Sequence, residues 1–314
     1  MILFVRLELL NMADAAVEET EAHEEVSAGL SKAEQAANDE IRAYEEAIAL
    51  EQARQERDQQ LLKSTQKVFT ILYKKFPYEV NAEISRTNRK RLGFQNEVTL
   101  SYSQAAYPEM IKQLARLTRL GLAESAEGHF VDLGSGVGTM MFAAALYHNF
   151  SSVTGIEILN DLFNVTNEVV CVWNELKEKL PPKKRDCEIK TLHGDCCYTD
   201  WSHADVVWCN ATCFDTKIID MIAKRSVDLK PGAFFIMCTR TLPADFMHFF
   251  NVVDSGSIVY NWGEANVTYY KRNRIPSAKH ISNKTEYVAS IIRRKALPVF
   301  DPTRAKPIAD ESAA

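Results

Sequence analysis

The sequence predicts an α/β fold built on a mainly parallel β-sheet, and three observations support this prediction. An apolar segment at 130–133 has the composition of a buried parallel strand. Glycines follow at alternate positions, and the apolar run at 140–146 then indicates a helix. Three further apolar segments, at 152–157, 188–195 and 204–210, each end in an acidic or amide side chain. A strand, a glycine turn and a helix form the first half of a nucleotide-binding βαβ unit.

The spacing of the glycines indicates which ligand the turn would hold. Dinucleotide-binding turns follow G-x-G-x-x-G, which lets a pyrophosphate reach the helix N-terminus. Here Gly134, Gly136 and Gly138 alternate, and Thr139 stands at the third glycine position of that pattern. Asp132 precedes the turn. An acid there repels a pyrophosphate but suits a ligand with an ammonium and a sulfonium group, so the turn predicts an S-adenosylmethionine site.

The ends of the next three strands supply the other polar groups of such a site. Glu157 is placed to accept hydrogen bonds from the ribose hydroxyls, and Asp195 to meet the adenine amino group. Asn210 ends the fourth strand with a carboxamide. Four polar strand ends in this order favour a cofactor site over the alternative, a Rossmann-like fold with acids there by chance.

The remaining segments complete a class I, Rossmann-like, seven-stranded methyltransferase fold with an α-helical N-terminal extension. Helical periodicity runs from Tyr107 to Leu120, with Pro108 in the first turn. A helix at 215–225 and a fifth strand at 231–238 follow. Strands at 257–262 and 266–272 are expected to pair as a hairpin around 263–265. Helices are also expected within 31–76, the second of them amphipathic and able to dock on the core.

Charge is distributed unevenly along a chain whose net charge is only -5. Residues 1–60 carry 15 acidic and 5 basic side chains. The balance reverses in two basic segments, 63–91 and 271–306, which suggest a basic face for a polyanion such as DNA, beside an acidic arm. Chance clustering on a solvated surface is the alternative for either segment. The run 86–91 is interpreted as a basic turn, which could be a nuclear-import signal, a phosphate contact or a solvated loop.

The seven cysteines include no C-x-x-C pair, and several lie on expected core strands. They are interpreted as buried free thiols of a reducing compartment, with neither a disulfide nor a metal site implied. The apolar run 1–5 is too short to span a membrane, so no membrane association is expected. We divide the chain into an acidic, disordered segment 1–30, a helical extension 31–94, a catalytic domain 95–273 and a basic tail 274–314.

Between residues 95 and 273 the chain carries motifs at 102–104, 132–138, 155–157, 194–196, 210–214 and 262–270. Taken together they resemble the motifs of the non-SET histone lysine methyltransferases founded by "disruptor of telomeric silencing". The run 132–138, Asp-Leu-Gly-Ser-Gly-Val-Gly, matches the first motif of that family without a change. The runs 155–157 and 194–196 resemble its ribose-binding and Gly-Asp-Phe motifs, and 210–214 resembles its Asn-Asn-Phe-x-Phe motif. Trp262 and the Val-Thr-Tyr-Tyr run ending at residue 270 recur at the family's spacing, and residues 102–104 resemble its Tyr-Gly-Glu lid.

The resemblance implies the residues of the site. The residues expected to contact the cofactor are Tyr102, Gln104, Asp132, Gly134, Ser135, Gly136, Thr139, Glu157, Asp195 and Cys196. Asn210 and Tyr269 are the catalytic candidates, because Asn210 would orient the amine and the methionine end of the cofactor. Phe214 and Trp262, with Tyr269, are expected to wall the substrate channel; the alternative for each of them is an ordinary core residue beside the fifth strand.

The chain also departs from the family pattern. Ser103 and Gln104 stand for the Gly and Glu of the lid, and Ala211 and Thr212 replace half of the fourth motif. Cys196 takes the place of an aromatic residue that stacks on adenine, a role left to Tyr198 or Trp201 (the closest aromatic residues in the chain).

By resemblance, the chain is a nuclear enzyme that methylates a lysine on the globular face of histone H3 in nucleosomes. The basic segments would then contact DNA phosphates. One alternative is a class I methyltransferase that acts on RNA, another protein or a small molecule. The other is a catalytically degenerate fold retained as a chromatin-binding scaffold, which the departures at 103–104, 196 and 211–212 would explain.

Overall fold

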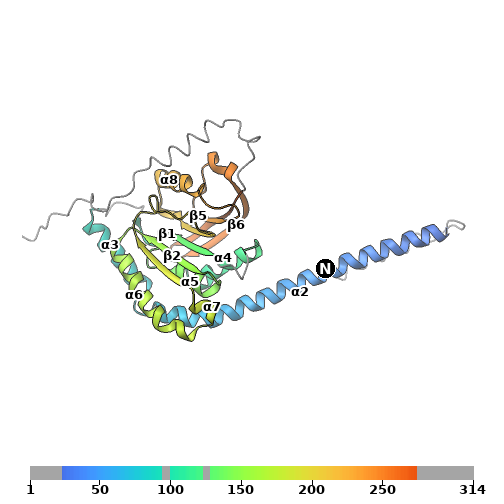
Figure 1. Cartoon of the computed structure of the whole chain (residues 1–314), viewed down its shortest axis with the longest axis horizontal. Helices are drawn as coiled ribbons and strands as arrows, with labels where there is room; N and C mark the ends of the chain where they lie inside the picture. Colours follow the sequence, from blue (N-terminus) through green and yellow to red (C-terminus); the bar gives the residue numbers. More distant parts are fainter. Residues whose placement is uncertain (1–22, 94–99, 123–127, 274–314) are drawn as a thin grey trace, which may run out of the picture. The chain divides into compact units, whose positions relative to one another are not determined.

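The computed structural model describes residues 23–93, 100–122 and 128–273, with side chains from Glu34 onward. Its centre is a seven-stranded sheet in the order β3-β2-β1-β4-β5-β7-β6, drawn in Figure 1. The strands are β1 (His129–Leu133), β2 (Ser152–Glu157), β3 (Glu188–His193), β4 (Val206–Asn210), β5 (Phe234–Cys238), β6 (Phe250–Tyr260) and β7 (Gly263–Arg272). The first five are parallel, and β7 pairs antiparallel with both β5 and β6. The expected class I methyltransferase topology is therefore confirmed.

Among the described residues, three helices precede β1 and four connect parallel strands. They are α2 (His23–Leu72), α3 (Tyr78–Arg91), α4 (Tyr107–Arg119), α5 (Thr139–Tyr147), α6 (Asn160–Leu176), α7 (Pro182–Arg185) and α8 (Thr216–Ser226). Short 3-10 turns are η2 (Lys177–Lys179), η3 (Ala211–Cys213) and η4 (Ala244–Phe249). None of the helices in the described residues is long and apolar enough to cross a bilayer.

The chain forms two compact units, Met1–Leu61 and Leu62–Ala314. In the first unit the described residues belong to α2, and their side chains are mostly exposed. The second unit holds the end of α2 and the whole sheet. The boundary between the units therefore lies inside α2. The sequence analysis instead placed segment boundaries after residues 30 and 94.

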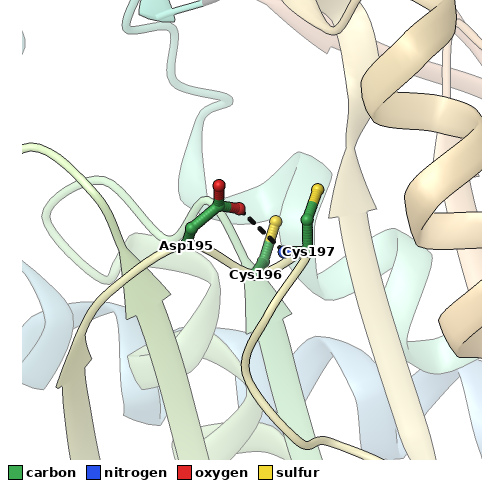
Figure 2. Close-up of side chains that lie close together, drawn as sticks. All are labelled: Asp195, Cys196 and Cys197. Carbon is green, nitrogen blue, oxygen red and sulfur yellow. Dashed lines mark hydrogen bonds between the residues drawn. The ribbon is translucent and has the colours of Figure 1, made fainter. Parts of the chain in front are cut away.

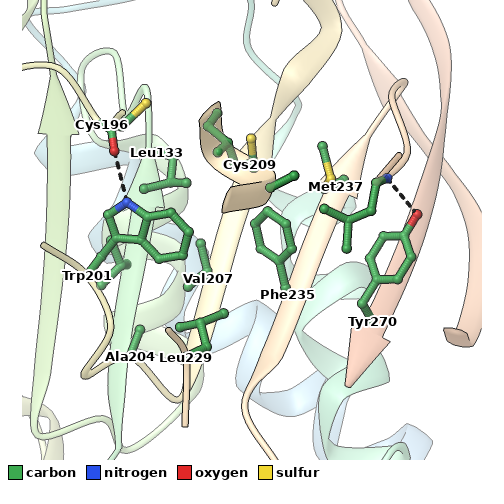
Figure 3. Close-up of a cluster of buried hydrophobic side chains, with 14 of the residues drawn as sticks. Leu133, Cys196, Trp201, Ala204, Val207, Cys209, Leu229, Phe235, Met237 and Tyr270 are labelled. Carbon is green, nitrogen blue, oxygen red and sulfur yellow. Dashed lines mark hydrogen bonds between the residues drawn. The ribbon is translucent and has the colours of Figure 1, made fainter. Parts of the chain in front are cut away.

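Alternating side chains cover the two faces of the sheet. Val131, Val207 and Phe235 point to one face, where they share an apolar cluster with α8, part of which is drawn in Figure 3. Phe130 points to the other face and packs against Phe150, 5.5 Å away between ring centroids. This alternation is the two-residue period of a strand, and burial on both faces explains the continuous apolar runs of β1, β4 and β5.

The end of α2 docks on the core, as expected for an amphipathic helix. Phe69 stacks on Tyr107 with 4.3 Å between ring centroids. The Tyr73 hydroxyl donates a hydrogen bond to the Val137 carbonyl at 3.0 Å, at the end of the glycine turn. Thus α2 supports the turn that the sequence analysis singled out.

Three elements differ from the prediction. The helix α2 is continuous from His23, whereas we expected a disordered segment up to residue 30 and separate helices after it. The run 86–91 is the last part of α3 and not a turn. The hairpin turn lies at Asn261 and Trp262, because β7 already begins at Gly263.

Candidate active site

A pocket lies at the carboxyl ends of β1, β2, β3 and β4. The sheet order reverses between β1 and β4, and ligands of open α/β sheets bind at such a switch point. The residues that line it come from strand ends, the glycine turn and the segment before α4: Leu100, Ser101, Tyr102, Ser103, Gly134, Ser135, Gly136, Thr139, Ile156, Glu157, Ile158, Leu159, Leu162, Gly194, Asp195, Cys196, Asn210, Thr212, Cys213, Phe214 and Ile218.

The glycine turn is anchored to β2. The backbone N–H groups of Gly134 and Ser135 both donate to the Ile156 carbonyl, at 2.9 and 3.0 Å. Gly136 has a φ of 58°, and a Cβ there would lie 2.8 Å from the Tyr102 ring. Only glycine therefore combines this backbone conformation with an aromatic ring at contact distance.

Glu157 is fixed by backbone donors on both oxygens. The Gly136 N–H donates to Oε2 at 2.7 Å, and the Leu159 N–H donates to Oε1 at 2.8 Å. Burial raises the pKa of Glu157, and these hydrogen bonds oppose the rise. The carboxylate thus keeps a set orientation at the β2 end, with lone pairs left for the two hydroxyls of a ribose.

Asp132 lies below the turn and is almost fully buried, so it does not line the pocket itself. Burial first, and then the negative charge of Glu157, raise the pKa of Asp132 to about 8. Two carboxyl groups in one buried region disfavour the second negative charge. A cationic ligand above them would relieve that repulsion, which is the electrostatic property we expected of Asp132.

Asp195, Cys196 and Cys197 follow β3, and Figure 2 shows their side chains close together. Their potential ligand atoms lie within 4.8 Å of one another, as in a metal site. However, Asp195 Oδ1 accepts the Cys197 backbone N–H at 2.8 Å. A hydrogen bond with Cys197 and burial raise the pKa of the Cys196 thiol, which disfavours the thiolate that a metal requires. We therefore keep Asp195 as the candidate for the adenine amino group.

Neither aromatic residue near Cys196 reaches the pocket. Trp201 is buried in the core, where its indole N–H donates to the Cys196 carbonyl at 2.9 Å (Figure 3). Tyr198 packs against the same core cluster. The lining offers a base the aliphatic side chains of Ile158 and Leu162, and neither Tyr198 nor Trp201 takes the place of the stacking aromatic of the family pattern.

Asn210 joins β4 to the segment over the pocket. Its Nδ2 donates to Ser103 Oγ at 3.2 Å, and its Oδ1 accepts the Thr212 hydroxyl at 2.7 Å. Phe214 lies beyond η3, where its ring would be 3.3 Å from a Cβ on Gly134. Both side chains line the pocket, as the sequence analysis expected of them.

The segment over the pocket is attached to the hairpin. The Tyr102 hydroxyl donates to Gln104 Oε1 at 2.7 Å, and the Gln104 backbone N–H donates to Asn261 Oδ1 at 3.2 Å. Ala105 forms an antiparallel bridge with Tyr260. Gln104 thus holds the Tyr102 ring in place but does not itself line the pocket.

Tyr269 and Trp262 lie away from the pocket, contrary to the expectation that they wall a channel. Tyr269 is fully buried, and its hydroxyl donates to Gln113 Oε1 at 2.6 Å. Trp262 is 46% exposed at the hairpin turn and stacks on Tyr260 at 5.5 Å. In this structure Tyr269 is a core residue between β7 and α4, and Trp262 is a surface residue.

The structure adds lining residues that the sequence analysis did not select, chiefly Ser103, Thr212 and Cys213. The sequence marked the first two only as departures from a family pattern. The available signals were that Thr212 is a polar residue two positions after Asn210 and that Ser103 follows Tyr102.

Comparison with known families decides the assignment. The sequence family described as "Histone methylation protein DOT1" matches residues 96–272, more than half of the chain. The chain belongs to the DOT1 family. It is therefore an S-adenosylmethionine-dependent methyltransferase, and the expected family and cofactor are confirmed.

No curated protein matches this DOT1-family chain. Among solved structures it is similar to an RNA methyltransferase from Salinibacter ruber in complex with S-adenosyl-L-homocysteine, with 19% identity, 55% of this chain and 97% of that chain covered, and a TM-score of 0.40. It is also similar to Methanocaldococcus jannaschii Trm5 in complex with adenosine, with 14% identity, coverages of 56% and 52%, and a TM-score of 0.39. Similarity at this level says nothing about the substrate of the DOT1-family chain.

The residues of the pocket fit the cofactor of the DOT1 family. Glu157 presents a carboxylate held by two backbone donors, which suits a ribose diol. The glycine turn brings its backbone close to Tyr102 and Phe214 on the pocket wall, and the buried acids Asp132 and Glu157 suit a cationic ligand. The residues that would hold the cofactor are Glu157 and Asp195 for its adenosine, and the glycine turn and Asn210 for its methionine part.

Proposed function

We propose that this chain methylates a lysine on the globular face of histone H3 within nucleosomes, and that it acts in the nucleus. Membership of a family described by histone methylation supports the substrate. One observation carries the proposal further: a basic helix reaches the pocket. Arg89 of α3 donates to Ser101 Oγ at 3.3 Å, and Ser101 is a lining residue.

The basic segment 63–91 is arranged to meet a polyanion. Its exposed basic side chains lie on the end of α2, in the turn that follows it and on α3: Lys63, Lys67, Lys74, Lys75, Arg86, Lys90 and Arg91. Arg86 pairs with Glu83 and Arg91 pairs with Asp161. The lysines remain suited to DNA phosphates, which would bring the pocket to the histone surface.

The second basic segment, 271–306, offers fewer side chains for DNA contacts than its composition suggests, because its first two basic residues are used within the fold. Arg272 is buried, and its guanidinium donates to the Val227 and Phe249 carbonyls. Lys271 lies over the Phe234 ring, 4.9 Å from its centroid. These two side chains stabilise the end of β7. The part of the segment from residue 274 to 306 lies outside the described residues, and its contact with DNA stays a proposal.

The chemistry follows from the lining of the pocket. The cofactor supplies an electrophilic methyl group on a sulfonium. A lysine amine must arrive neutral, although its ordinary pKa is about 10.4. Phe214 and Ile218 offer an apolar approach that disfavours the ammonium form, so proton loss to water needs no dedicated base. Positioning by Asn210 is then the main catalytic contribution of this chain.

The test is transfer of a tritiated methyl group from S-adenosylmethionine to nucleosomes, free histone H3 and RNA in parallel. We expect label in H3, and more in nucleosomes than in free H3. A triple Lys74→Gln, Lys75→Gln, Lys90→Gln variant should lose the nucleosome preference. A matched double variant of exposed lysines outside the segment, Lys179→Gln and Lys183→Gln, should keep it.

Two results would reject the proposal. Label in RNA with none in H3 would assign the enzyme to another substrate class. No label in any substrate, with no thermal stabilisation by S-adenosylmethionine, would indicate the degenerate scaffold.

A further inference from the structure

Thr239 has a backbone conformation that β-branched residues avoid. Its φ is 67°, and among the described residues it is the one non-glycine residue with a positive φ. The Arg240 N–H donates to the Cys238 carbonyl at 2.8 Å, which makes Thr239 the centre of a strained three-residue turn at the end of β5. Strain of this kind persists where the surroundings enforce it, and it clusters at functional sites.

The Thr239 side chain begins a chain of hydrogen bonds that leads to the pocket. Its Oγ1 lies 2.8 Å from Thr212 Oγ1. The Thr212 hydroxyl is 2.7 Å from Asn210 Oδ1, and Asn210 Nδ2 is 3.2 Å from Ser103 Oγ. This series of hydrogen bonds therefore connects β5, η3, β4 and the segment over the pocket through four side chains.

The direction of these hydrogen bonds follows from their donors. The Thr212 backbone N–H, which can only donate, faces Asn210 Oδ1 at 3.5 Å and so identifies Oδ1 as the acceptor end of the amide. Thr212 then uses its hydroxyl proton on Oδ1, so Thr239 must donate to Thr212. Asn210 Nδ2 donates to Ser103, which leaves the Ser103 hydroxyl with its own proton to donate. Hydrogen bonds that run in one direction polarise one another.

The last hydroxyl of this series of hydrogen bonds, that of Ser103, lies where an acceptor of the cofactor is expected. Ser103, Asn210 and Thr212 all line the pocket, at its β4 side. Glu157 and Asp195, the proposed contacts of the adenosine, lie at the β2 end and after β3, so we expect the methionine part on the β4 side of the pocket. Its carboxylate is an acceptor, and a hydroxyl is a donor that can meet it.

We propose that Thr239 is a positioning residue for cofactor binding. Through Thr212 and Asn210 it fixes the Ser103 hydroxyl as a donor to the methionine carboxylate. Residues 103 and 212, which depart from the family pattern, thus belong to the same series of hydrogen bonds as the strained Thr239. The proposal uses the cofactor assignment and does not depend on the histone substrate.

The experiment is calorimetric titration of the full chain with S-adenosylmethionine and with its decarboxylated analogue. Thr239→Val and Ser103→Ala should each weaken S-adenosylmethionine binding about tenfold, which corresponds to about 1.4 kcal/mol and is typical of one hydrogen bond. Neither should change the affinity for the analogue by more than about twofold. Thr239→Ser, which keeps the hydroxyl, should bind as the unchanged chain does.

Thr191→Val is the matched control. Thr191 Oγ1 donates a hydrogen bond to Asn167 Oδ1 at 2.6 Å, and neither residue lines the pocket. It should bind both ligands normally. Unchanged S-adenosylmethionine affinity in Ser103→Ala, or equal losses for both ligands, would overturn the proposal. Unchanged S-adenosylmethionine affinity in a folded Thr239→Val would overturn it as well. If that variant fails to fold, Thr212→Val, which interrupts the same series of hydrogen bonds, takes its place.

Discussion

The backbone N–H of Gly136 donates to Glu157 Oε2 at 2.7 Å, so the glycine turn and the acid at the end of β2 form one unit. The Leu159 N–H holds the other oxygen at 2.8 Å. A carboxylate held in this way is oriented before a ligand arrives, and the orientation costs no entropy on binding.

Glu157→Ala should weaken S-adenosylmethionine binding by about 1.5–3 kcal/mol, because hydrogen bonds to a charged group are lost. Glu157→Gln should be no better, because its NH2 group would face one of two backbone donors. Calorimetry checks both variants. An unchanged affinity in Glu157→Ala would contradict the assignment of the ribose site.

Gly136→Ala should weaken cofactor binding more than about tenfold, because its Cβ would displace the Tyr102 ring 2.8 Å away. Gly232→Ala is the matched control, since its φ is also positive, at 89°, and its Cβ would meet nothing within 4 Å. Both variants carry backbone strain and should lose stability to a similar extent. Only the first should lose affinity, and a similar affinity in the two would mean that the Tyr102 contact is irrelevant.

Cofactor binding should release protons near neutral pH. Burial and Glu157 raise the pKa of Asp132 to about 8, so its carboxyl is mostly protonated at neutral pH without a ligand. A cationic ligand favours the carboxylate, so affinity should rise with pH until about 8. Calorimetry at about pH 6.5 in buffers of different ionisation enthalpy measures the released protons. Asp132→Asn should abolish the release, and an equal release in that variant would assign the protons elsewhere.

The raised pKa of Asp132 makes the stability of the fold decrease with pH, whereas cofactor affinity increases with pH. Between the ordinary value of 3.8 and about 8, the folded chain keeps a proton on Asp132 that the unfolded chain has lost. The contribution of this group to stability therefore falls as the pH rises through that range. Asp132→Asn should flatten the decrease in the free energy of unfolding, as measured by denaturant titration.

Asn210→Ala should lower turnover by more than about a hundredfold, because positioning is the main catalytic contribution proposed for this chain. Its cofactor affinity should fall by no more than about tenfold, the effect of one hydrogen bond. Steady-state kinetics and calorimetry separate the two effects. A normal turnover number would reject the catalytic role of Asn210.

Much of the fold and part of the site could be predicted from the sequence. Buried parallel strands leave continuous apolar runs, and their last polar residues, such as Glu157 and Asn210, mark the ligand edge. The helix α3 was missed for a physical reason. Its buried residues are Asn81, Ser85 and Asn88, so a polar stripe replaces the apolar periodicity that identifies helices.

The positions of Tyr269 and Trp262 could not be predicted from the sequence for a different reason. The register of an antiparallel hairpin decides which face a side chain takes, and a shift of one residue reverses it. Tyr269 pairs in register with Ile236 and faces Gln113 of α4. Nothing local distinguishes that placement from one on a pocket wall. The Thr239 turn was likewise invisible, since its φ depends on contacts between separate strands.

Salt dependence should show whether the lysines of 63–91 meet DNA. Each phosphate contact contributes about 0.9 to the slope of log K against log salt concentration. The triple variant of Lys74, Lys75 and Lys90 should therefore reduce the slope of nucleosome binding by up to about 2.7. Fluorescence anisotropy at several salt concentrations measures it, and an unchanged slope would remove the reason for assigning DNA contacts to this segment.

The most direct measurement of the central claim is intact-mass analysis of histone H3 recovered from nucleosomes after incubation with the chain and S-adenosylmethionine. We predict that H3 gains methyl groups with the unchanged chain, and gains fewer with Glu157→Ala at a limiting concentration of S-adenosylmethionine. Unmodified H3, from a chain that S-adenosylmethionine demonstrably stabilises, would contradict the proposed substrate.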